Sequence, residues 1–168
     1  MAGKLVQVAT VTADNTTSSI TLTGINTDDV YMVAINDFRA STQQALFARI
    51  TKGGTADSTN NYDYAYKDLK SYAVFTNTSA TNVDDLNFGT GDDEAERGMY
   101  GIIYLYNFNN SSEYSFLTQE NFQLISGTSL FGQMGGSVHT VASASDGIQF
   151  FVTIGTVKAG TFTLYRVV

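Results

Sequence analysis

Side-chain polarity alternates with a period of two residues along most of this chain, and this alternation limits the fold more than any other feature. Leu5–Thr12 and Val30–Phe38 show it clearly, as β-strands with one buried face do. The 3.6-residue period of an amphipathic helix is nearly absent. Helical turns are expected only at Arg39–Gln44 and Asp92–Arg97. The alternation therefore predicts an all-β protein.

Clusters of Asn, Asp, Ser and Gly separate the alternating segments and favour turns between them. Asp146-Gly147 is typical of a hairpin turn. Gly132–Gly136 lacks the Lys-Ser/Thr ending of a phosphate-binding loop, so a loop or bulge is expected there. No linker divides residues 1–168, which are expected to form one antiparallel sandwich or barrel. The expected strands are Leu5–Thr12, Ser19–Thr23, Val30–Phe38, Ala45–Thr51, Tyr62–Tyr66, Tyr72–Thr76, Met99–Phe108, Tyr114–Ser126, Val138–Val141, Ile148–Ile154 and Thr161–Val168.

The composition excludes several kinds of site and partner. The 168 residues are 43% hydrophobic, include no Cys and one His, and carry a net charge of −7. Disulfides, thiolate metal sites and multi-histidine sites are thereby excluded. The acidic balance argues against nucleic acid, and no apolar run approaches the roughly 20 residues that span a bilayer. Because the N-terminal residues lack the apolar stretch of a signal peptide, we expect assembly in a cytoplasm.

Catalysis is not expected. His139 is the single imidazole base, but no Gly-x-Ser-x-Gly nucleophile motif accompanies it. A hydrogen-bonded or exposed strand histidine is the simpler interpretation. The chain is therefore predicted not to be an enzyme and to need no cofactor or metal.

An acidic stretch holds most of the net charge. It lacks the register of an EF-hand calcium loop, and its crowded carboxylates have no defined separation for glycoside cleavage. A solvated loop is the simplest interpretation, and a cation site and a partner-facing patch stay open. The acidic residues are Asp84, Asp85, Asp92, Asp93, Glu94 and Glu96.

Tyrosines concentrate in the middle of the chain. Aromatic side chains serve as core residues, as anchors for a protein partner, or as stacking platforms for sugars, and all three interpretations stay open. The tyrosines are Tyr62, Tyr64, Tyr66, Tyr72, Tyr100, Tyr104, Tyr106 and Tyr114.

The chain contains no Pro, one of the residues that protect exposed sheet edges. Its edges are covered by association with other copies or with a larger scaffold, or are protected by short strands and polar loops. Both explanations stay open.

Several segments resemble small virion proteins of tailed bacteriophages, particularly marine ones. In that family a final Gly-Thr-Phe-x-Leu-Tyr strand closes a β-sandwich, and members usually continue with Gly, where this chain has Arg166. An Arg-bearing loop, here at Arg39, follows the early segment. The similar segments are Ile25–Ile35, Gly101–Phe116, Gly136–Phe150 and Gly160–Val168.

The resemblance implies a virion structural role without catalytic residues. We expect a jelly-roll-like sandwich that forms a trimer and, as a capsid decoration (cement) protein on the virion surface, binds the major capsid protein. An N-terminal contact arm is expected over residues 1–8. A tail-fibre module that binds host glycans is the alternative, and a polysaccharide-cleaving enzyme is a third hypothesis. The expected contact residues are Leu5, Val6, Tyr62, Tyr64, Tyr66, Tyr104 and Tyr106.

Overall fold

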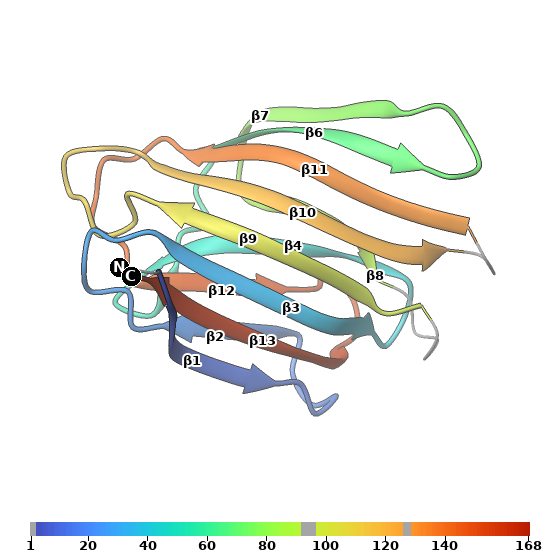
Figure 1. The fold of residues 1–168 in the computed structure, drawn as a ribbon, viewed down its shortest axis with the longest axis horizontal. Helices are drawn as coiled ribbons and strands as arrows, with labels where there is room; N and C mark the ends of the chain where they lie inside the picture. The colour runs from blue at the N-terminus through green and yellow to red at the C-terminus, as the bar shows by residue number, and fades with distance from the viewer. Residues whose placement is uncertain (1–2, 92–96, 126–128) are drawn as a thin grey trace.

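A computed structural model describes residues 3–91, 97–125 and 129–168 of the chain. Its regular structure consists of β-strands that pair antiparallel throughout (Figure 1). The strands are β1 (Leu5–Thr12), β2 (Ser19–Thr23), β3 (Tyr31–Ala40), β4 (Gln44–Lys52), β5 (Thr55–Ala56), β6 (Tyr62–Lys70), β7 (Thr76–Val83), β8 (Leu86–Gly91), β9 (Met99–Tyr106), β10 (Ser115–Ile125), β11 (Ser129–His139), β12 (Gly147–Phe151) and β13 (Val157–Val167).

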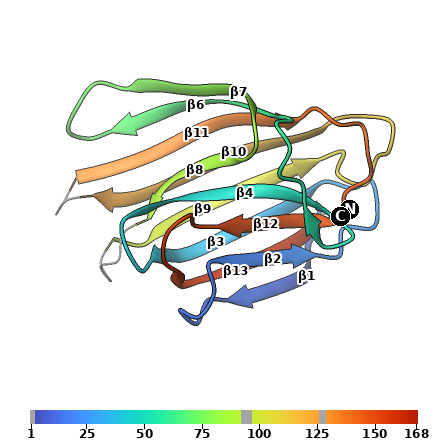
Figure 2. The ribbon, with the colours of Figure 1, turned by 180° about the vertical axis from the view of Figure 1, so that it is seen from behind.

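Two sheets lie face to face. The larger has the strand order β1-β13-β3-β9-β10-β11-β6-β7, and the smaller has the order β2-β12-β4-β5, with β8 also paired to β4. Figure 2 shows the smaller sheet in front of the larger one. The predicted single-domain antiparallel β-sandwich is confirmed.

Eight of the strands form a jelly roll. They make two four-stranded sheets with the orders β1-β13-β3-β9 and β2-β12-β4-β8. The chain passes from one sheet to the other between β1 and β2, between β2 and β3, and again between β12 and β13. This alternation between two packed sheets is the topology of a jelly roll.

Two insertions extend the larger sheet beyond the jelly roll. One lies between β4 and β8 and supplies β6 and β7; the other lies between β9 and β12 and supplies β10 and β11. In Figures 1 and 2, β11, β6 and β7 project past the edge of the smaller sheet. We call β10, β11, β6 and β7 the extension.

Aromatic side chains from both sheets fill the core. Phe150 of the smaller sheet contacts Phe162 of the larger one, with ring centroids 5.2 Å apart. Phe38 meets Phe162 edge to face at 6.1 Å. All three are fully buried. Fully burying a side chain of this size contributes roughly 1.5–3 kcal/mol, so the inter-sheet contacts are the main apolar support of the fold.

Three local predictions were wrong. Residues 39–44 contain the end of β3, a bend and the start of β4 in place of a helical turn, because so short a segment does not sustain a helix alone. The expected strand Tyr72–Thr76 is mainly the turn between β6 and β7. Asp146-Gly147 does not close a hairpin, because β11 and β12 belong to different sheets. The second helical segment falls largely on residues 92–96, which lie outside the described residues.

The glycine-rich segment 132–136 was also mispredicted, since it lies inside β11. A Cβ on Gly135 would lie 2.3 Å from the carbonyl oxygen of Ala65 on β6, and one on Gly132 would lie 2.8 Å from that of Asn121 on β10. Glycine is therefore needed here for close approach of neighbouring backbones.

Candidate protein-binding face

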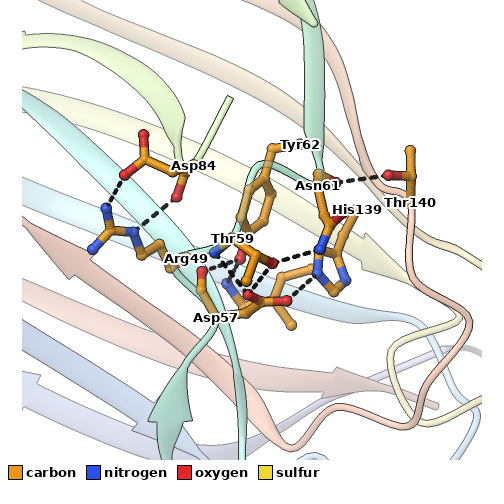
Figure 3. Close-up of polar contacts among 9 residues, drawn as sticks. Arg49, Asp57, Thr59, Asn61, Tyr62, Asp84, His139 and Thr140 are labelled. Carbon is orange, nitrogen blue, oxygen red and sulfur yellow. Dashed lines mark hydrogen bonds and ion pairs between the residues drawn. The ribbon is translucent and has the colours of Figure 1, made fainter. Parts of the chain in front are cut away.

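The single histidine lies at the end of β11 in a hydrogen-bonded cluster (Figure 3). His139 Nε2 is 2.9 Å from Asp57 Oδ2, and the ring lies 4.9 Å from that of Tyr62. The Tyr62 hydroxyl donates to the carbonyl oxygen of Asp57 and accepts from the amide of Ile50 on β4. The cluster therefore ties the segment before β6 to both sheets.

Electrostatics in this cluster favour an ionised Asp57. Burial acts to raise the pKa of Asp57, but hydrogen bonds from the side chain and amide of Thr59 and from His139 outweigh it, so the pKa lies below its usual value. Burial raises the pKa of the Tyr62 hydroxyl. Nδ1 of His139 is buried without a hydrogen-bond partner. The cluster therefore joins β11, β4 and the segment before β6. His139 is a hydrogen-bonded strand residue in contact with the carboxylate of Asp57.

Part of the predicted acidic stretch is structural. Arg49 on β4 donates to the carbonyl oxygen of Asp84 at 2.8 Å and pairs with its carboxylate. The guanidinium lies 4.6 Å from the centre of the Phe151 ring. Burial, followed by the nearby charge of Asp84, raises the pKa of Asp85, although Arg49 opposes this. The remaining acidic residues, Asp92, Asp93, Glu94 and Glu96, lie outside the described residues.

Within residues 3–91, 97–125 and 129–168, His, Cys, Asp and Glu nowhere gather in threes as a metal site would need. The same residues contain no helix of the length and apolarity required to cross a bilayer.

Two of the predicted contact tyrosines are in the core, which corrects that prediction. Tyr62 and Tyr66 are 0% and 4% exposed, because the even-numbered residues 62, 64 and 66 of β6 point toward the smaller sheet and the odd-numbered ones point outward. Tyr64 is partly buried and its ring stacks on that of Tyr66 at 4.9 Å. These side chains therefore supply packing at the sheet's inner face.

The expected N-terminal arm, residues 1–8, is not a free arm, because from Leu5 onward it is part of strand β1. Leu5 and Val6 belong to β1 and pair with Val167 and Arg166 of β13. Lys4 also exchanges backbone hydrogen bonds with Val168, and Figure 1 shows the two ends of the chain side by side. Leu5 nevertheless stays half exposed, and contact with a partner there stays a prediction.

Tyr104 and Tyr106, the other predicted contact residues, point away from the smaller sheet on β9. Tyr104 is 38% exposed. Directly opposite on β10 are Thr118 and Phe116. The pairing of β10 with β11 extends this outer surface across β11, where Met134 lies opposite Glu120. We call the outer surface of these three strands the docking face; its exposed large apolar side chains are Tyr100, Ile102, Tyr104, Phe116, Phe122, Leu130 and Met134.

Three adjoining hollows cross this face. The first, about 520 Å³, lies over Phe116, Gly136 and Ala65. Thr118 joins it to a second of about 490 Å³ between Tyr104 and Met134. The third, about 440 Å³, lies beside Tyr100 and Phe122 and shares Ile102 and Glu120 with the second. The docking face is therefore uneven, and apolar side chains stand between its hollows.

Part of the inner surface of the extension, on β10 and β11, is polar. Four amide side chains of β10 and β11 are buried there, and Gln133 donates to Asp68 of β6 at 2.9 Å. Several of their amide atoms have no hydrogen-bond partner, and β8 lies against them at Gly89. We call this group the amide layer: Gln119, Asn121, Gln123 and Gln133.

At this amide layer, β10 and β11 therefore invert the usual polarity of a sheet that covers a core. On β10, Gln119, Asn121 and Gln123 point inward while Phe116 and Phe122 point to solvent. The sequence predicted Tyr104 and Tyr106 of the docking face as contact residues but not its other apolar members, because alternation alone does not say which face of a strand is inward. The aromatic content of 99–124 was the available signal.

The fold and this face define a jelly-roll β-sandwich with an exposed apolar surface on its extended sheet. No protein-family model matches the chain, and no curated protein matches it in sequence.

Proposed function

We propose that this chain is a structural protein of a bacteriophage virion, a capsid decoration protein that binds the major capsid protein lattice through the docking face. The observation that carries the proposal is the inverted polarity of β10 and β11, which bury amides and expose Phe116, Phe122 and Met134. Exposed apolar patches of this kind mark interaction surfaces. A protein lattice would cover these side chains.

The fold and the sequence resemblance support this role. Jelly rolls occur in viral capsid proteins and also in lectins, and a fold alone does not assign a function. A decoration protein acts by mass action: it binds the assembled lattice in preference to free subunits, so each bound copy stabilises the shell. Assembly in the host cytoplasm and trimer formation belong to the same proposal.

The direct test uses shells of the virus that encodes the chain, stripped of this protein, in a co-sedimentation assay. We expect saturable binding and shells that disassemble at higher temperature when the protein is bound. Phe122→Ser is expected to weaken binding by about tenfold or more, as loss of a central aromatic anchor does. Thr161→Ser, a substitution on β13 outside the docking face, is the matched control and should bind as the wild type does.

The proposal fails if the purified protein shows no affinity for these shells and virions lacking it keep their thermal stability. Copy number adds an independent check. A copy number per virion comparable with that of the major capsid protein supports a location on the shell, and a far smaller copy number supports a location in the tail.

A glycan-binding module of a tail fibre is the second candidate. It is favoured by Tyr100 and Phe122, whose rings stack at 6.1 Å on the exposed face and offer the flat apolar surface on which sugars pack. Calorimetric titration with host lipopolysaccharide oligosaccharides tests it. Heat of binding that Tyr100→Ala abolishes would favour this candidate, and no heat would remove it.

A further inference from the structure

A single carboxylate lies in the middle of the docking face. Glu120 of β10 is exposed, and its cross-strand neighbours are Ile102 on β9 and Met134 on β11. It lines two of the three hollows. The described residues offer it neither an ion pair nor a hydrogen bond.

Covering this face with a purely apolar surface would bury the Glu120 carboxylate without a partner. An unpaired carboxylate moved out of water costs several kcal/mol, which would offset much of the gain from covering the apolar side chains. A cation placed against it removes that penalty and adds a charge-assisted hydrogen bond. From this we infer that the partner's surface is apolar with a central Lys or Arg side chain that pairs with Glu120. The inference rests on the proposed function and names the chemistry of its partner.

A second copy of this chain does not fit the same face. A two-fold axis over Glu120 would bring two carboxylates together, which costs several kcal/mol. An axis midway between β9 and β10 would place Glu120 on Ile102 of the other copy, because these residues are paired. Each chain also carries a net charge of −7.

A two-fold axis along β11 would place Lys67, a cation on the outer surface of β6, opposite Glu120 of the other copy. This follows because Met134 on β11 pairs with Glu120 on one side and with Lys67 on the other. The same axis would set apolar Ile102 against Asn77, which pairs with Lys67. Lys67 already donates to Asn77 at 3.1 Å. The geometry therefore favours a different protein as the occupant.

The test measures binding of variants to the stripped shells at several salt concentrations. Glu120→Gln should weaken binding by about tenfold or more and flatten its salt dependence, and Glu120→Lys should abolish detectable binding. Glu113→Gln is the matched control, because Glu113 lies in the loop before β10 and accepts from Asn107. It should bind as the wild type does. Circular dichroism and thermal melts confirm that each variant is folded.

The outcomes separate this inference from the proposed function. If Glu120→Gln binds within about twofold of wild type while Phe122→Ser loses binding, the face docks without a cation and the inference is wrong. If sedimentation velocity shows wild-type self-association that Phe122→Ser abolishes, the occupant is a second copy and the inference is again wrong. If the wild type does not bind the shells, the proposed function falls and the inference falls with it.

Discussion

The jelly roll and the extension share one continuous sheet but distribute polarity in opposite ways. Across β1 and β13 the outer surface carries threonines, with Thr10 bonded to Thr163 and Thr12 to Thr161, while the inner surface is fully apolar around Phe162. Across β10 and β11 the inner surface carries the amide layer, and the outer surface exposes Phe116, Phe122, Leu130 and Met134.

The difference follows from what each surface faces. The jelly-roll strands face the smaller sheet, so burial of their inner side chains drives folding. The extension projects beyond that sheet, and β8 is the strand that lies against its amide layer. Phe116, Phe122, Leu130 and Met134 instead lie exposed on its outer surface. Under the proposed function, this outer surface is the part of the extension that binds the lattice.

The largest expected effect is in the jelly-roll core. Phe150→Ala should lower the free energy of unfolding by about 3–5 kcal/mol, because it leaves a cavity between Phe88 and Phe162. Phe122→Ala on the docking face should change it by no more than about 0.5 kcal/mol. Denaturant titration measures both. Equal losses would show that the outer aromatics stabilise the isolated chain, and the contrast between the halves would not hold.

Two substitutions in the amide layer should change the free energy of unfolding differently. Gln133→Met removes the hydrogen bond to Asp68 and should destabilise the protein by about 1–3 kcal/mol. Gln119→Met replaces an amide whose two polar atoms are both unpartnered, and should be neutral or stabilising by about 1 kcal/mol. Chemical denaturation of the two variants compares them directly. A large loss in Gln119→Met would mean that ordered water satisfies this amide.

The smallest expected effect concerns pH at the end of β11. Because hydrogen bonds hold the pKa of Asp57 below its usual 3.8, this group stabilises the fold above that pH, and the contribution is lost as pH falls through the lower folded-state value. Asp57→Asn should therefore be less stable than wild type at neutral pH, and the difference should shrink in acid. Thermal melts between neutral pH and strong acid measure it, with Asp28→Asn as control. A difference that is constant with pH would contradict the assignment.

Strand positions were accessible from the sequence because alternation is a local property. Leu5–Thr12 and Ser19–Thr23 were predicted with the bounds that the structure shows. β7 and β8 were missed because Asn, Ser and Gly interrupt their patterns. The central part of β11 was missed because its glycines resemble a loop until their close neighbours on β6 and β10 are known.

By itself, the sequence determined the all-β class, a single antiparallel sandwich or barrel, and a tyrosine-rich middle region. Only the tertiary structure decided that Tyr62 and Tyr66 are core residues, that Tyr104 is exposed, and that Glu120 stands alone among apolar side chains. The reason is physical. Period-two alternation creates two faces, but pairings between distant strands, such as β6 with β11, decide which face is covered.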